Sequence, residues 1–194
     1  MAEPALSFEE MWERIMACDR HYDGIFYTAV KTTRIYCRPS CRSRKPKKMN
    51  VEFYSNIHQV EQAGYRACKR CQPDQADSPS VTLVRQASAF LIQNYKQRLL
   101  LEDVAAHVGV SPFYLDRVFK LETDETPRTY LEQIRIDKAA YLLRHTERSN
   151  LEISYDCGFQ STSHFYKAFR RLKHCSPGEY RRNHNERDPS LMDG

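Results

Sequence analysis

Four cysteines have the residue type and the spacing of a metal site. Cys37 and Cys41 are separated by three residues, and after a gap of 26 residues Cys68 and Cys71 are separated by two. Two close pairs joined by a long loop supply four thiolates, and Zn²⁺ favours such a closed tetrahedral sulfur shell. The spacing predicts one zinc ion per chain on these cysteines, in preference to two disulfides or four unrelated buried thiols.

Basic side chains surround both cysteine pairs. Seven Lys and Arg residues and no acid lie between Arg34 and Lys48, and Arg66, Lys69 and Arg70 lie beside the second pair. One such cluster is equally consistent with a solvated face, and the net charge of +5 is a weak indication of a polyanionic partner. Because two clusters flank the predicted metal site, we interpret this region as a surface that binds DNA.

The amino-terminal sequence and the hydropathy indicate in which cellular compartment the chain resides. The first 16 residues mix acidic and apolar side chains and lack the cationic start of a secretory leader. No window approaches the roughly 18 uninterrupted apolar residues of a membrane span. We therefore expect a cytoplasmic chain without a membrane partner, whose thiols stay reduced. The remaining cysteines, Cys18, Cys157 and Cys175, are predicted to be buried small hydrophobic residues.

The chain divides at a polar segment, residues 72–80, that contains two prolines. Residues 1–76, before it, carry short alternating apolar runs that favour β-strands, with helices near 8–18 and 56–63. A domain of this size gains stability from a metal staple. We place a linker at 77–81.

Residues 82–183 have a helical period of 3.6, and 184–194 form a polar tail. The helical segment contains an internal repeat of about 50 residues. The matched positions are Leu101-Glu102 with Leu151-Glu152, Gly109 with Gly158, Leu115 with Phe165, Phe119-Lys120 with Phe169-Arg170, and Thr126-Pro127 with Ser176-Pro177. The repeat predicts two equivalent supersecondary units.

Each unit has the pattern of a helix-turn-helix. In the first, a helix from Leu101 to Val108 stops at Gly109, and Ser111 caps the next helix with Pro112 at its first position. The predicted inward stripe is Leu115, Val118 and Phe119, which leaves Phe113, Asp116 and Arg117 outward as candidate DNA contacts.

In the second unit, residues 153–157 precede Gly158, and Ser161 opens the second helix. Its predicted inward residues are Phe165, Ala168 and Phe169, and its outward candidate DNA contacts are Ser163, His164 and Lys167. The helix over 130–143 between the units is long enough to set them one DNA turn apart, roughly 34 Å. Two motifs in one chain make a monomer sufficient for binding double-stranded DNA. The expected fold is a small α+β zinc-binding domain followed by an all-α domain with two helix-turn-helix motifs.

The helical segment closely resembles the AraC/XylS class of transcription regulators over residues 82–182. The motifs that carry the resemblance are Ser111-Pro-x-x-Leu-x-Arg-x-Phe-Lys120, Gly158-Phe159, Phe169 and Ser176-Pro-x-x-Tyr-Arg181. The resemblance implies that two recognition helices enter successive major grooves on one face of the duplex. It also implies RNA polymerase as a partner.

The amino-terminal part resembles the zinc domain of the Ada family. The matching segments are Asp23-Gly24, Ala29-Val-Lys-Thr-Thr33, Ile35-Tyr-Cys-Arg-Pro-Ser-Cys-Arg-Ser-Arg44, Asn50-Val-x-Phe-Tyr54, Ala63-Gly64 and Cys68-Lys-Arg-Cys-Gln-Pro-Asp74. In that family the domain takes a methyl group from a methylphosphotriester in DNA onto a zinc-bound cysteine, and methylation makes the protein an activator of alkylation-repair genes. The resemblance implies that Cys37 is the acceptor, with Thr33 near the reactive sulfur and Arg44 near the phosphate.

The chemistry of thiolates agrees with that expectation. Zinc keeps a thiolate deprotonated at neutral pH, and the leaving group of the transfer is a phosphodiester anion that Arg42 or Arg44 can hold. The thioether product does not return the methyl group, so each molecule reacts once. The candidate DNA contacts of this domain are Thr33, Arg34, Arg42, Arg44, Lys45 and Lys47.

An alternative of another class stays open. The chain would then be a non-enzymatic AraC-type regulator whose four-cysteine zinc site is structural, or which senses thiols or metals. The variant Cys37→Ala with its zinc retained separates the two. Repair of O6-methylguanine is disfavoured because the sequence contains no Pro-Cys-His-Arg segment.

Overall fold

The computed structural model describes residues 6–75 and 79–185 of the chain. Contacts between residues divide it into two compact units: the first contains the residues up to Ala89 and Leu121–Thr123, and the second contains Phe90–Lys120 and the residues from Asp124 on. Part of the predicted linker, residues 77 and 78, lies outside the described residues. The remainder, residues 79–81, belongs to helix α3, which spans Pro79–Gln93.

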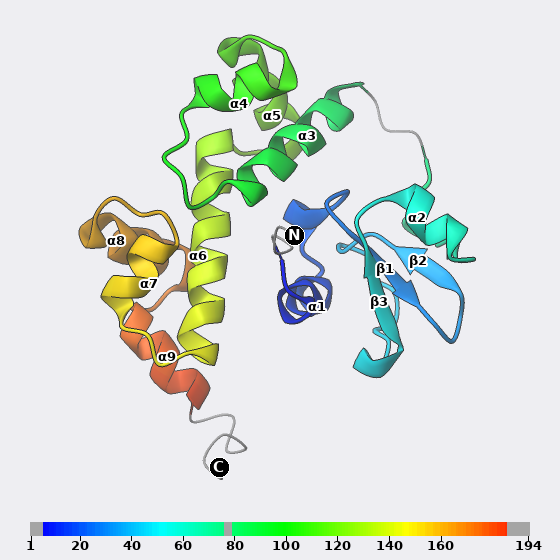
Figure 1. The fold of residues 1–194 in the computed structure, drawn as a ribbon, viewed down its shortest axis with the longest axis horizontal. Coiled ribbons are helices and arrows are strands. Elements are labelled where there is room, and N and C mark those ends of the chain that lie inside the picture. The colour runs from blue at the N-terminus through cyan, green and yellow to red at the C-terminus, as the bar shows by residue number, and fades with distance from the viewer. Residues whose placement is uncertain (1–5, 76–78, 186–194) are drawn as a thin grey trace. The chain divides into compact units, whose positions relative to one another are not determined.

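A four-stranded sheet forms the framework of the first unit. Its strands are β1 (Tyr27–Val30), β2 (Ile35–Cys37), β3 (Val51–Tyr54) and β4 (Arg66–Ala67), in the spatial order β3-β1-β2-β4. β1 lies between β2 and β3 and pairs antiparallel with both (Figure 1). β2 pairs parallel with β4. The strands predicted within 24–36 and at 51–54 are confirmed, and β4 is an addition to them.

Helix α1 (Phe8–Ala17) precedes the strands in the sequence, and α2 (Ile57–Gln62) lies between β3 and β4. They confirm the helices predicted near 8–18 and 56–63. Short 3₁₀ turns lie at Arg20–Tyr22 and Lys48–Asn50. Ser7 and Glu10 form a capping box that fixes the start of α1.

The core of the first unit lies on one face of the sheet, where Val60 of α2 packs against strand residues. Its buried members are Tyr27, Ala29, Tyr36, Val60 and Tyr65. Side chains alternate between the two faces along a strand, so Thr28 and Cys37 point to the opposite face. The α2 side of the sheet is therefore structural, whereas the other side carries Cys37 and also packs against α1 through Phe53 and Phe8.

The second unit is helical and contains the two expected helix-turn-helix motifs. Its helices after α3 are α4 (Leu101–Val108), α5 (Pro112–Thr123), α6 (Pro127–His145), α7 (Asn150–Asp156), α8 (Thr162–Lys173) and α9 (Pro177–Asn185). The first motif is α4 with α5, the second is α7 with α8, and α6 joins them (Figure 1).

The capping signals work as expected. Gly109, with φ +73°, ends α4, and the hydroxyl of Ser111 accepts a hydrogen bond from the backbone N–H of Tyr114 at the start of α5. Gly158, with φ +81°, ends the turn after α7. A Cβ on Gly158 would stand 2.6 Å from the Tyr95 carbonyl oxygen, so this position also needs glycine for close packing.

The inward faces of both recognition helices are confirmed. The predicted core residues are all buried: Leu115, Val118 and Phe119 of α5, and Phe165, Ala168 and Phe169 of α8. The second motif packs on α6 through a cluster that includes Ile136, Ala140 and Leu143. α6 is thus the support that positions α8.

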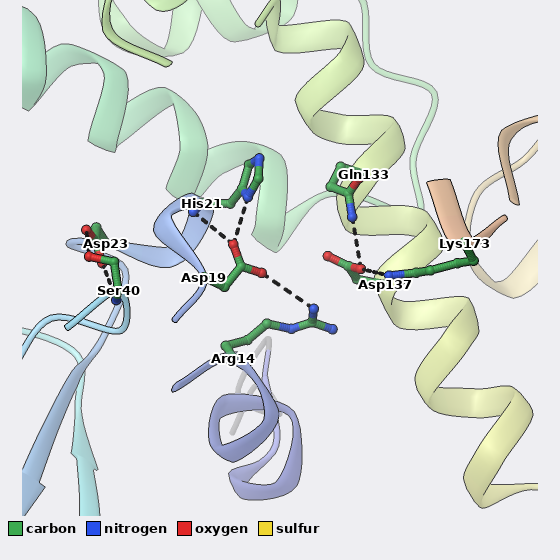
Figure 2. A network of polar contacts seen from close by, with 8 residues as sticks. All are labelled: Arg14, Asp19, His21, Asp23, Ser40, Gln133, Asp137 and Lys173. Carbon is green, nitrogen blue, oxygen red and sulfur yellow. Dashed lines mark hydrogen bonds and ion pairs between the residues drawn. The ribbon is translucent and has the colours of Figure 1, made fainter. Parts of the chain in front are cut away.

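A buried ion pair also ties α8 to α6. The carboxylate of Asp137, which is 2% exposed, accepts hydrogen bonds from Lys173 Nζ at 2.7 Å and Gln133 Nε2 at 3.0 Å (Figure 2). Loss of one partner of such a pair leaves a charge in an apolar surrounding, which is strongly unfavourable. The pair therefore favours a single arrangement of these two helices.

The cysteines outside the metal cluster differ from one another. Cys157 is fully buried, and burial raises its pKa to about 12, which confirms its prediction. The prediction was wrong for Cys18 and Cys175, which are only half-buried. Cys18 caps α1 with φ +54°, and its thiol donates to the carbonyl oxygen of Cys41 at 3.7 Å. None of the helices in the described part of the chain is both long and apolar enough to cross a membrane.

Candidate metal centre

The sheet brings the two cysteine pairs to one place. Cys37 is the last residue of β2, and Cys68 follows β4 directly. Because β2 and β4 are parallel neighbours, the pairs leave the sheet at the same end, and the Cys68 N–H donates to the Tyr36 carbonyl at 3.0 Å. The sulfur atoms of Cys37, Cys41, Cys68 and Cys71 all lie within 4.8 Å of one another.

This cluster fits one zinc ion. Four thiolates at such distances repel one another, and a divalent cation at their centre removes that repulsion. An all-sulfur donor set is soft, and Zn²⁺ accepts its tetrahedral geometry without a preference of its own. The predicted zinc cofactor is confirmed at the level of its ligand cluster.

The pKa values of the thiols show how strongly the four groups interact. Hydrogen bonding to Cys71, followed by burial, raises the pKa of Cys37, and burial raises the pKa of Cys41. The hydrogen bond from Cys37 lowers the pKa of Cys71 to about 5. These opposite shifts show that the cysteines interact strongly, and a metal ion that binds them must displace the protons of the thiols.

Polar contacts fix the segments around the cluster. The Asp23 carboxylate accepts two hydrogen bonds from Ser40, which lies between Cys37 and Cys41 (Figure 2). The Asp19 carboxylate accepts hydrogen bonds from the backbone N–H and the ring Nδ1 of His21, and Arg14 lies 3.5 Å from it (Figure 2). These contacts join the end of α1 and the following turn into one frame.

The basic residues predicted to contact DNA are placed on the surface of this unit. Thr33 and Arg34 lie exposed in the turn between β1 and β2, and the Arg34 guanidinium lies over the Tyr65 ring at 5.0 Å. Arg42, Arg44 and Lys47 are also exposed, as free cationic contacts require.

Lys45 differs from these residues. Its Nζ donates to the carbonyl oxygens of Cys41, at 3.3 Å, and Ile15, so its ammonium group is engaged by the backbone. This position ties the loop after Cys41 to the end of α1. Lys45 and Arg44 line a small cavity of about 40 Å³ beside Cys37.

The outward residues of the recognition helices occupy the expected positions. Phe113 is 80% exposed, and Arg117, Ser163 and Lys167 are exposed as well, whereas Asp116 is half-buried.

His164 is exposed but has a partner within the protein. Its Nε2 lies 2.9 Å from Oε1 of Glu132 on α6, and Glu132 also pairs with Arg171 of α8. The sequence pattern missed Glu132 because helical spacing reports neighbours on one helix and not across two. The same limit explains why Ser40 was missed as the partner of Asp23.

Comparisons with known proteins agree with both units. Residues 10–74 match the family model of the metal binding domain of Ada, and residues 104–183 match a helix-turn-helix domain model. The solved DNA-binding domain of AdpA, a global transcriptional factor in complex with a target DNA, aligns with a TM-score of 0.52 at 28% identity, over 58% of this chain and 98% of that chain.

Two curated relatives cover both units. The bifunctional transcriptional activator/DNA repair enzyme AdaA of Bacillus subtilis (strain 168) is 32% identical over 173 residues, 89% of this chain and 82% of AdaA. The corresponding Ada protein of Escherichia coli (strain K12) is 36% identical over 162 residues, 84% of this chain and 46% of Ada, so the chain spans about half the length of that relative. With both domains matched in the same order, the chain belongs to the Ada family of bifunctional transcriptional activators and DNA repair enzymes.

Proposed function

We propose that this chain removes methyl groups from methylphosphotriesters in DNA by irreversible transfer to the sulfur of Cys37. We further propose that the methylated chain activates transcription of alkylation-repair genes. The observation that carries the proposal is the cluster of four sulfur atoms within 4.8 Å of one another, in a basic surface of a chain that also has two helix-turn-helix motifs.

The transfer requires a reactive sulfur that stays anionic. Zinc, when bound, stabilises all four cysteines as thiolates at neutral pH. The Cys37 sulfur attacks the methyl carbon in line with the C–O bond. An S–C bond forms, the C–O bond breaks, and its electron pair passes to the phosphate oxygen, which leaves as a phosphodiester anion.

Exposure favours Cys37 over Cys41, the other thiol of its pair, whereas Cys71 is also half-buried, so the choice of Cys37 rests on the resemblance to the Ada zinc domain. Cys37 is half-buried, whereas Cys41 is 6% exposed, and Cys37 lies at a cavity that Arg44 also lines. A guanidinium beside the sulfur can hold the phosphate through two hydrogen bonds and stabilise the negative charge that develops on its oxygen. Thr33 and Arg42 are proposed to hold the flanking backbone.

Methylation also supplies a switch. Conversion of one thiolate to a thioether removes one negative charge from the cluster, which lies among Arg38, Arg42 and Arg44. Repulsion from DNA phosphates then falls, so the methylated chain binds its operator more tightly without a change of fold.

The second unit is proposed to supply sequence recognition. Phe113, Asp116 and Arg117 of α5, and Ser163, His164 and Lys167 of α8, contact the major groove and its phosphates. A monomer carries both motifs, so it is proposed to bind one operator alone and to recruit RNA polymerase there. Because chromosomal DNA is the substrate, the proposed compartment is the cytoplasm.

A binding experiment tests the combined proposal. The zinc-loaded chain is incubated with DNA that carries methylphosphotriesters, and operator affinity is compared before and after methyl uptake at several salt concentrations. The proposal expects tighter binding by the methylated chain, with a larger ratio at low salt. Equal affinities at every salt concentration would rule out the switch, and absence of methyl uptake would favour a structural zinc site in a non-enzymatic regulator.

A further inference from the structure

A hydroxyl group lines the small cavity beside Cys37, and the proposed reaction gives this group no role. The cavity measures about 40 Å³, and its lining includes Ile15, Thr28, Val30, Cys37, Cys41 and Arg44. Thr28 of β1 lies directly opposite Cys37 of β2 in the antiparallel register. Opposed residues of an antiparallel pair point to the same face, so Thr28 lies on the reactive side of the sheet.

The Thr28 hydroxyl is buried without a hydrogen-bond partner. The residue is 4% exposed, and its Oγ1 has no donor or acceptor within reach among the described residues, the cysteine sulfurs included. A buried hydroxyl is unfavourable unless it is hydrogen-bonded, and valine would fill the same space at no such cost. Threonine at this position therefore indicates a partner that comes from outside the protein.

The cavity has room for that partner. To hold a water molecule, a cavity needs a volume of about 10–15 Å³ and two to four polar neighbours. The volume of about 40 Å³ meets the first condition, and Thr28, Ser43, Arg44 and the sulfurs on the lining meet the second. The cavity is too small to take a nucleotide, so the phosphotriester itself must stay at its mouth.

We propose that Thr28 is a positioning residue for methyl transfer, an inference that rests on the proposed function. Its hydroxyl holds one water in the cavity, and this water donates a hydrogen bond to an oxygen of the phosphotriester held by Arg44. As negative charge passes from the Cys37 sulfur to the phosphate oxygen, this bond strengthens. No proton is transferred in this step, since the water keeps both of its hydrogens.

A direct bond from Thr28 to the sulfur would have the opposite effect. Donation of a hydrogen bond to the Cys37 thiolate would stabilise the reactant and slow the attack. The hydroxyl lacks a sulfur within hydrogen-bond reach, which argues against that role. The two assignments predict opposite changes in rate when the hydroxyl is removed.

The test compares Thr28→Val, which keeps the shape but lacks the hydroxyl, with Thr28→Ser, which keeps the hydroxyl. The first-order rate of methyl uptake is measured on zinc-loaded chain with saturating methylated DNA. Loss of a hydrogen bond to a developing charge should slow Thr28→Val about tenfold, while Thr28→Ser stays within about twofold. Thr82→Val, the same change at an exposed position of α3, serves as the matched control and should keep the wild-type rate.

Two further measurements separate positioning from structure. Zinc content should be unchanged in Thr28→Val, and its unfolding temperature should be equal or higher, because a hydroxyl without a partner in the protein is replaced by a methyl group. A high-resolution crystal structure of the zinc-loaded wild type should show a water bound to Thr28 Oγ1, absent from Thr28→Val.

Each contrary result has a distinct meaning. An unchanged or faster rate in Thr28→Val would overturn the positioning role, and a loss of zinc or a lower unfolding temperature would show that the hydroxyl is structural instead. Absence of methyl uptake by the wild type would overturn the proposed function and this inference with it. Wild-type uptake with equal rates in the variant would overturn this inference alone.

Discussion

The carboxylate of Asp23 accepts a hydrogen bond from the Ser40 backbone N–H at 2.9 Å and a second from the Ser40 hydroxyl at 2.6 Å. Asp23 lies in the turn before β1, and Ser40 lies in the loop between Cys37 and Cys41 (Figure 2). Burial raises the pKa of Asp23 although both bonds from Ser40 act to lower it. The contact fixes the conformation of the loop that separates the first two metal ligands.

Ser40→Ala should therefore weaken zinc retention. Removal of the hydroxyl leaves the Asp23 carboxylate with the backbone bond alone, and the loop that spaces Cys37 and Cys41 loses part of its support. We expect about a tenfold lower zinc affinity, measured by competition with a chelator, which is the low end for residues that support metal ligands. Ser55→Ala, at an exposed serine away from the cluster, is the control, and equal affinities of the two variants would contradict the expectation.

Removal of the metal should destabilise the first unit selectively. The small sheet depends on the four-cysteine cluster to hold the ends of β2 and β4 together, whereas the helical unit has its own core around α6. Trp12, the single tryptophan of the chain, lies in α1 and reports on the first unit. We expect chelation to lower the denaturation midpoint seen by Trp12 fluorescence and to leave most of the helical circular dichroism intact. An unchanged Trp12 midpoint would argue against a stapling role.

Glu52 should make the first unit sensitive to acid. The Tyr65 hydroxyl donates to its carboxylate at 2.7 Å, the Tyr54 hydroxyl at 3.1 Å, and Lys31 lies 3.4 Å away. The hydrogen bond from Tyr65 is the largest cause that lowers the pKa of Glu52. Tyr54 and Lys31 lower this pKa further, and burial opposes them. Because the folded pKa lies below the unfolded one, the stabilisation is complete above about pH 4.3 and is lost as pH falls through the folded value.

The measurement is the difference in unfolding temperature between wild type and Glu52→Gln, followed by Trp12 fluorescence. The comparison cancels the acid sensitivity of the thiolates, which both proteins share. We expect the difference to favour the wild type near neutral pH and to shrink as the pH falls below about 4.3. A difference that stays constant across the titration would show that the carboxylate charge does not contribute.

Lys167 should contribute to DNA binding through a phosphate. Its side chain is exposed on α8, on the side opposite the buried Phe165 and Phe169. Lys167→Ala should weaken binding to operator and unrelated DNA alike, and it should reduce the slope of log affinity against log salt by about one. Lys138→Ala on α6, outside the recognition helices, should leave that slope unchanged. A loss confined to the operator would indicate instead that Lys167 contacts a base.

The parts that the sequence could predict are those with local causes. Gly109 and Ser111 set the ends of α4 and α5 through backbone conformation and capping, and these boundaries follow from a few adjacent residues. The cysteine spacing was equally informative, since two short loops suffice to define the ligands.

The parts that could not be predicted depend on residues far apart in the chain. Thr28 and Cys37 meet only through the register of β1 with β2, and Glu132 reaches His164 only because α8 packs on α6. The hydrogen bond from the Lys45 ammonium group to the Ile15 carbonyl oxygen depends on where α1 ends. Composition and periodicity contain no information on such pairings.

The central claim is that Cys37 accepts one methyl group from damaged DNA. The direct measurement is peptide mass spectrometry of the zinc-loaded chain after incubation with DNA that carries methylphosphotriesters, with Cys175→Ser as a control that should react normally. We predict a single methyl group on the peptide that contains Cys37, at one per chain when DNA is in excess. A methyl group on another residue, or an unmodified chain that has retained its zinc, would contradict the account.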